Sequence, residues 1–127
     1  MEVKLKKATA EQLKIPPASM SGVVFGTQFS DHMFCMEWED GKGWHNAEIK
    51  PYGPLLMEPS AMVLHYAQMA FEGLKVYRTD SGENVLFRPR ENFKRMNRTA
   101  QRMCLPELDV EEVLNALKQL LRLDSAW

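Results

Sequence analysis

The fold is decided by residues 31–49, which read DHMFCMEWEDGKGWHNAEI. Residues 31–38 form a short run rich in large apolar side chains, which is typical of a β-strand partly covered on both faces. The next residues contain the turn sequence DGKG, and the loose alternation over residues 44–49 predicts a strand that returns antiparallel. A proline within residues 50–54 cannot donate a hydrogen bond to the ladder, so we expect the pairing to break there. The stretch therefore predicts a β-hairpin.

A short helix and a second hairpin are expected next. The spacing of apolar residues between Met62 and Phe71 indicates a short helical piece, which Gly73 ends. Residues 74–78 and 85–88 are strand-like and flank the turn sequence Asp-Ser-Gly. These two runs predict a second antiparallel pair.

Two longer helices complete the expected fold. Pro89 suits the first turn of a helix, where its missing N–H is not needed. Apolar side chains recur behind it at helical spacing, at Phe93, Met96, Ala100 and Met103. Asp109 is a good N-cap with Glu112 three residues on, and one apolar stripe follows: Val110, Val113, Leu114, Leu117, Leu120 and Leu121. Strands followed by helices predict an α+β fold, a two-layer sandwich whose antiparallel sheet carries helices on one face.

Composition narrows the class of function. The 127 residues are 45% hydrophobic and 26% charged, which is ordinary for one globular domain. Sixteen Lys and Arg against seventeen Asp and Glu give a net charge of −1 with the signs interspersed, so we expect no nucleic-acid partner. We see no apolar run of membrane-spanning length and no signal peptide, and we expect a cytoplasmic protein without membrane contact. Residues 1–22 are polar and carry two adjacent prolines, which favours an arm over the surface.

The cysteines and histidines do not suggest a metal site or a disulfide. Cys35 and Cys104 lack C-x-x-C spacing, and we expect them to be free thiols that fill apolar space. His32 lies three residues from Cys35 in an expected strand, so the two side chains point to opposite faces and cannot share a metal ion. His65 is expected to be a hydrogen-bonded structural histidine, with general base as the alternative.

Several spaced motifs resemble the N-terminal domain of branched-chain amino acid aminotransferases. They occur in the family's order from about Val23 to Trp127, and only the arm before Val23 lies outside the resemblance. The motifs are FGTQFSDHM at 25–33, EW at 37–38, LHYA at 64–67, FEGLK at 71–75, LFRP at 86–89, Asn92, Arg95-Met96 and Leu105-Pro106.

The resemblance implies an enzyme that uses pyridoxal 5′-phosphate and has the fold of D-amino acid aminotransferase. Such enzymes transfer the amino group between leucine, isoleucine or valine and 2-oxoglutarate, in branched-chain amino-acid biosynthesis, and the family suggests a homodimer or another homo-oligomer. Residues 23–127 would form an incomplete small domain. The Schiff-base lysine would lie in a C-terminal domain beyond Trp127, so we expect this chain alone to be inactive.

The resemblance also assigns candidate site residues. Arg95 matches the family's arginine that contacts the cofactor phosphate, and a permanently charged fork suits a phosphate dianion. Its alternative is a solvated helix face shared with Arg98 and Arg102. Three aromatic residues match the substrate side-chain pocket: Tyr66, Phe71 and Phe25. Ordinary core packing is the alternative for the two phenylalanines.

Other interpretations remain open at this point. Lys75 follows a glycine turn, but no neighbour would obviously lower its pKa, and we expect a structural or surface lysine. Aminodeoxychorismate lyase and D-amino acid aminotransferase share the fold type and are alternatives. A third alternative, from another class, is a non-catalytic binding or assembly module.

Overall fold

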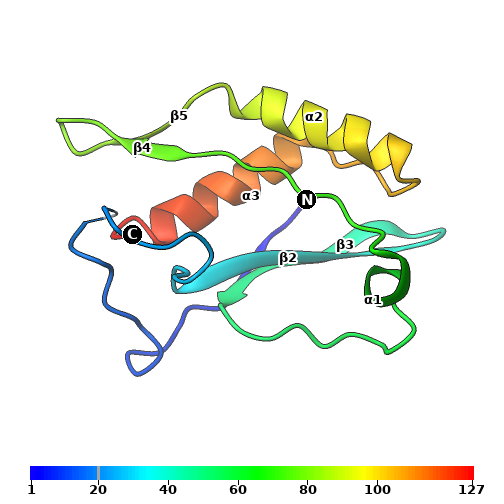
Figure 1. Ribbon diagram of the computed structural model, residues 1–127, viewed down its shortest axis with the longest axis horizontal. Coiled ribbons are helices and arrows are strands. Elements are labelled where there is room, and N and C mark those ends of the chain that lie inside the picture. Colours follow the sequence, from blue (N-terminus) through cyan, green and yellow to red (C-terminus); the bar gives the residue numbers. More distant parts are fainter. Residues whose placement is uncertain (20) are drawn as a thin grey trace. The chain divides into compact units, whose positions relative to one another are not determined.

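The computed structural model describes the helices and strands of residues 1–19 and 21–127 (Figure 1). The chain divides into two compact units. Unit 1 comprises Met1–Pro54 together with Asn115–Trp127, and unit 2 comprises Leu55–Leu114. Each unit has its own sheet and its own buried residues, and each is described by itself.

The first hairpin is confirmed in unit 1. Strand β2 (His32–Glu39) pairs antiparallel with strand β3 (Gly43–Pro51). Gly41 and Gly43 have φ values of 78° and 75° in the connecting turn, a left-handed backbone that glycine adopts without steric cost. Pairing continues to Pro51, which lies opposite His32, so it ends later than the expected break from residue 50. Pro51 is the last residue of the strand, where a missing N–H is tolerated.

A β-bulge re-aims the side chains of β3. Cys35 pairs with Glu48 and Glu37 pairs with His45, so β3 has one extra residue between these pairs. Asn46 accommodates it with a φ of 51°, and its Nδ2 donates to Glu37 Oε2 at 2.8 Å. Ala47, within the bulge, and Ile49, two residues further along β3, are buried and form part of the core of unit 1.

The N-terminal arm contributes a strand that the sequence pattern did not predict. Strand β1 (Lys4–Leu5) runs parallel to β3 beside Glu48 and Ile49, which gives the sheet order β1-β3-β2. The sheet is therefore mixed, and the expectation of a purely antiparallel sheet was wrong. The outer edge of β3 offers unpaired backbone groups, and the arm satisfies some of them: the N–H of Lys6 donates to the carbonyl of Ile49 at 2.8 Å.

Unit 2 begins with a helix that is shorter than predicted. Helix α1 (Met62–Tyr66) ends at Ala67, whose φ of 50° is left-handed, so residues 67–73 are not helical. A helix of about one turn has few hydrogen bonds, so they do not offset the cost of continuing the helix through this residue. The second hairpin is confirmed as strands β4 (Val76–Arg78) and β5 (Asn84–Leu86), which pair antiparallel.

The two longer helices are also confirmed. Helix α2 (Pro89–Arg102) opens on the predicted proline, and helix α3 (Val110–Leu123) follows the predicted N-cap. Asp109 Oδ1 accepts the N–H groups of the next two acidic residues at 3.0 and 2.9 Å. Buried residues of unit 2 are Phe93, Ala100, Val113 and Leu114, and Ala116, in the part of α3 that belongs to unit 1, is buried as well.

A reciprocal amide contact fixes the connection between α2 and α3. The side chain of Asn97 donates to the carbonyl of Leu108 at 2.8 Å and accepts its N–H at 2.9 Å. Cys104, in the same connection, is exposed, so its expected role as an apolar filler was wrong. The α+β class is confirmed, whereas the two-layer arrangement stays a prediction. In the described part of the chain, no helix has the length and apolar character required to cross a membrane.

Candidate functional site

One polar arrangement in unit 2 joins helix α2 to the segment before β4 and includes a shielded carboxylate. Arg95 lies on α2, and its guanidinium meets the carboxylate of Glu72, 23 residues earlier in the chain. Nε donates to Glu72 Oε2 at 2.8 Å, and Nη2 donates to Oε1. Two parallel hydrogen bonds between a planar fork and a carboxylate fix direction as well as distance. The pair therefore sets the direction in which the arginine projects.

Asn92 holds the same carboxylate from one turn earlier on α2. Its Nδ2 donates to Glu72 Oε1 at 3.1 Å and to the carbonyl of Gly73 at 2.9 Å. The bond from Arg95, aided by that from Asn92, outweighs desolvation and lowers the pKa of Glu72 to about 2. The carboxylate is thus charged at neutral pH, and its hydrogen bond with Arg95, followed by its charge, raises the pKa of that guanidinium.

The outer part of the guanidinium faces solvent. The side chain of Arg95 is 59% exposed, whereas that of Glu72 is 8% exposed. The hydrogen bonds to Glu72 use Nε and Nη2 and leave the Nη1 donors for an anion. An anchored, exposed and permanently charged fork fits a phosphate group, so the residues present are compatible with the implied cofactor. Arg98 and Arg102 are exposed on the same helix, so the solvated-face alternative stays open.

Two of the three aromatic candidates lie in unit 2, and both are exposed. The exposed fraction is 76% for Tyr66, the last residue of α1, and 78% for Phe71. Phe71 directly precedes Glu72, so one short segment carries both an apolar ring and the carboxylate that holds Arg95. Ordinary core packing is therefore wrong for Phe71 within the described chain.

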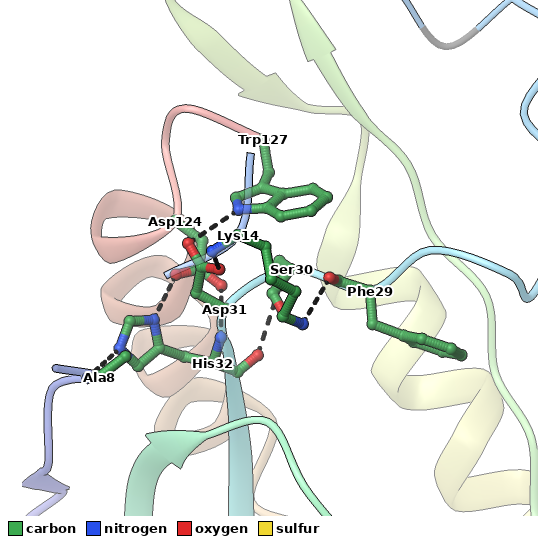
Figure 2. A network of polar contacts seen from close by, with 8 residues as sticks. All are labelled: Ala8, Lys14, Phe29, Ser30, Asp31, His32, Asp124 and Trp127. Carbon is green, nitrogen blue, oxygen red and sulfur yellow. Dashed lines mark hydrogen bonds and ion pairs between the residues drawn. The ribbon is translucent and has the colours of Figure 1, made fainter. Parts of the chain in front are cut away.

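The third candidate, Phe25, lies in unit 1 and is 93% exposed, so core packing is wrong for it too. The segment that follows it is held by Lys14 of the arm (Figure 2). Lys14 Nζ donates to the carbonyls of Phe29 and Ser30 at 2.9 and 2.7 Å. The rings of Phe29 and Tyr52 are stacked with centroids 4.7 Å apart. Phe29 and Ser30 of the FGTQFSDHM motif are therefore anchored, whereas the ring of Phe25 is exposed to solvent.

Unit 1 contains a network of polar contacts that the sequence did not predict (Figure 2). It joins the N-terminal arm, the start of β2 and the residues at the end of α3. His32 is buried at the start of β2, between the N–H of Ala8 and the carboxylate of Asp124. Next to it, Asp31 accepts the N–H of Lys14 at 2.9 Å and the indole N–H of Trp127 at 3.0 Å. Desolvation raises the pKa of Asp31, but the hydrogen bonds from Lys14 and Trp127 outweigh it and leave that pKa below its usual range.

The remaining single residues behave as the sequence predicted. His65 Nε2 lies 2.6 Å from the carbonyl of Pro59, so this histidine is hydrogen-bonded to backbone. Lys75 is exposed directly before β4, as expected for a surface lysine. In the sequence Glu72 stands out only as part of the FEGLK motif, and the one local signal for it is a carboxylate between an aromatic residue and a glycine.

Comparison with known proteins gives a consistent result. The chain is 48% identical over 125 residues to "Branched-chain-amino-acid transaminase 1" of Bacillus subtilis, covering 98% of this chain and 34% of that protein. It is 48% identical over 118 residues to the cytosolic branched-chain-amino-acid aminotransferase of Saccharomyces cerevisiae, covering 93% and 31%. It is 43% identical over 127 residues to a probable branched-chain-amino-acid aminotransferase of Staphylococcus aureus, covering 100% and 35%. No family model matches the chain.

All three relatives are named as transaminases or aminotransferases. The chain belongs to the branched-chain-amino-acid aminotransferase family. It spans about a third of the length of the curated relatives it matches. Since alignments cover 98% and 100% of the chain, the similarity extends into residues before Val23, which had been expected to lie outside it.

Proposed function

We propose that this chain is part of an enzyme that transfers the amino group between leucine, isoleucine or valine and 2-oxoglutarate. The names of the relatives support this class of reaction. The observation that carries the proposal is the arrangement of Arg95, which Glu72 fixes on one side while its other side faces solvent. Pyridoxal 5′-phosphate, when bound, supplies the electron sink that this transfer needs.

Each candidate residue has a proposed role in that enzyme. Arg95 binds and orients the cofactor phosphate through charge-assisted hydrogen bonds. Tyr66, Phe71 and Phe25 contribute apolar wall for a branched aliphatic side chain, because aromatic rings supply large contact area at a low cost in entropy. The exposure of all three rings in this chain is consistent with surfaces that serve a ligand rather than a core.

The remaining parts of the proposal concern the complete protein. The lysine that binds the cofactor covalently is proposed to lie outside residues 1–127, as part of a further domain. The complete protein is proposed to act in the cytoplasm as a homodimer in branched-chain amino-acid biosynthesis.

A glutamate-formation assay tests the proposed function. The complete protein with pyridoxal 5′-phosphate and 2-oxoglutarate is expected to form glutamate from leucine, isoleucine and valine. Turnover of D-alanine or aminodeoxychorismate in place of these substrates would instead favour the related enzymes. Residues 1–127 alone are expected to form no glutamate, because positioning cannot replace the covalent cofactor link. Turnover by this chain that Lys75→Ala abolishes would overturn that expectation.

A further inference from the structure

We propose that Glu72 is a positioning residue for the cofactor phosphate, acting through Arg95. The inference rests on the proposed phosphate contact of Arg95 and adds the group that aims it. Glu72 itself would not touch the phosphate, since both of its oxygens already accept hydrogen bonds from α2.

The geometry supports an orienting role for this carboxylate. A free arginine side chain has many rotamers, and fixing it upon binding an anion costs conformational entropy. Here the fork–fork contact selects one orientation before any anion arrives. Asn92 in turn restrains Glu72 by donating to its Oε1 and to the carbonyl of Gly73. Glu72 thus orients Arg95, and Asn92 in turn restrains Glu72.

Burial separates this pair from the other ion pairs of the helix. Glu91 and Lys94 form an ion pair on α2 at 3.0 Å, but their side chains are 49% and 56% exposed. The carboxylate of Glu72 is almost completely shielded from solvent. A shielded carboxylate holds its partner more firmly, because water competes less for the hydrogen bonds. Glu91 therefore offers a matched control: an acid paired with a base on the same helix that does not contact Arg95.

The position of Glu72 also links two parts of the proposed site. Its neighbour Phe71 is proposed to line the substrate pocket, and its carboxylate aims the residue proposed to bind the phosphate. One segment before β4 would therefore set both the apolar wall and the direction of the phosphate ligand.

Binding of two cofactor forms tests the inference without an activity assay. Pyridoxal 5′-phosphate and pyridoxal, which lacks the phosphate, are titrated into the complete protein by absorbance. Glu72→Gln keeps the shape of the side chain and removes its charge. It is expected to weaken binding of pyridoxal 5′-phosphate by roughly tenfold and to leave pyridoxal binding unchanged, since the phosphate contact alone is affected. Glu91→Gln is expected to change neither affinity.

Combination with Arg95→Ala separates this inference from the proposed function. If Glu72 acts through Arg95, the double variant binds pyridoxal 5′-phosphate no more weakly than Arg95→Ala alone. A loss of affinity in Arg95→Ala without one in Glu72→Gln overturns the inference and leaves the proposed function standing. Unchanged affinity in Arg95→Ala overturns the phosphate contact itself. Tighter binding in Glu72→Gln would mean that the carboxylate competes with the phosphate, and equal losses for both cofactor forms would mean a merely structural role.

Discussion

His32 Nδ1 lies 2.5 Å from Oδ1 of Asp124, a residue 92 positions further along the chain, and both side chains are buried. The N–H of Ala8 donates to the other ring nitrogen, Nε2, at 2.9 Å. Nε2 therefore carries no proton, and Nδ1 is the atom that donates to Asp124. The imidazole ring of His32 joins the N-terminal arm, the start of β2 and the end of α3 within unit 1.

Asp124→Asn is expected to destabilise the chain by about 2–3 kcal/mol, measured by urea denaturation. Asp124 accepts two hydrogen bonds from His32, one from the ring and one from the backbone N–H at 3.0 Å. An amide presents a donor where one of these acceptors is needed, so a buried polar group loses its partner. Glu39→Gln removes an exposed partner of Lys42 and is the control, with an expected change below about 0.5 kcal/mol. Equal effects of the two substitutions would show that the buried pair adds nothing.

The ion pair of Glu72 predicts an acid-dependent loss of stability. The folded-state pKa, about 2, lies below the ordinary value of 4.5, so the carboxylate stabilises the folded chain above about pH 4.5. This contribution falls as the pH drops from about 5 towards about 2. The difference in unfolding free energy between wild type and Glu72→Gln is therefore expected to shrink over that range. A difference that stays constant from pH 6 to pH 3 would mean that Glu72 is not held as a charged group.

Lys14→Met is expected to loosen the segment that follows Phe25. The substitution removes the Nζ donor to the carbonyls of Phe29 and Ser30 and keeps most of the apolar stem. Amide exchange in residues 25–30 should accelerate by roughly tenfold, corresponding to about one charged hydrogen bond. Lys7→Met, at an exposed position of the same arm, is the control. Unchanged exchange in both variants would show that the Nζ hydrogen bonds do not hold the segment.

Phe71→Ala in the complete protein is expected to reduce kcat/KM for leucine, isoleucine and valine more than for glutamate. Each lost CH₂ contact is worth about 0.8 kcal/mol, so part of an apolar wall should be visible in the ratio. Phe87→Ala removes another exposed ring that is not a candidate site residue and serves as the control. Equal losses for aliphatic and acidic substrates would indicate general destabilisation instead of a pocket.

The predictable parts of this fold are those that local sequence determines. The first hairpin follows from its turn glycines, and α3 follows from the cap at Asp109 and its apolar stripe. By contrast, α1 is shorter than its apolar spacing suggests, because the left-handed backbone at Ala67 is not visible in that periodicity. The parallel strand β1 was not predicted either, since a strand of two residues, one of them a lysine, is too short to show a strand pattern in the sequence.

The contacts that organise the candidate site could not be predicted because they depend on distant residues. Nothing local to Arg95 shows that Glu72 holds it, and nothing near His32 points to Asp124. Arg95 is a candidate only because it matches a family motif. Without that match, several arginines on one helix indicate simply a solvent-exposed face. The sequence thus indicates which residue types are candidates, whereas the structure shows which of them are anchored.

A titration of two arginine variants tests most directly the proposed contact between Arg95 and the cofactor phosphate. Arg98 lies on the same helix, is exposed and does not contact Glu72, so Arg98→Ala is the matched control for Arg95→Ala. In the complete protein, Arg95→Ala is predicted to weaken binding of pyridoxal 5′-phosphate by roughly tenfold or more, and Arg98→Ala to leave it unchanged. Wild-type affinity in Arg95→Ala together with weakened binding in Arg98→Ala would contradict the account.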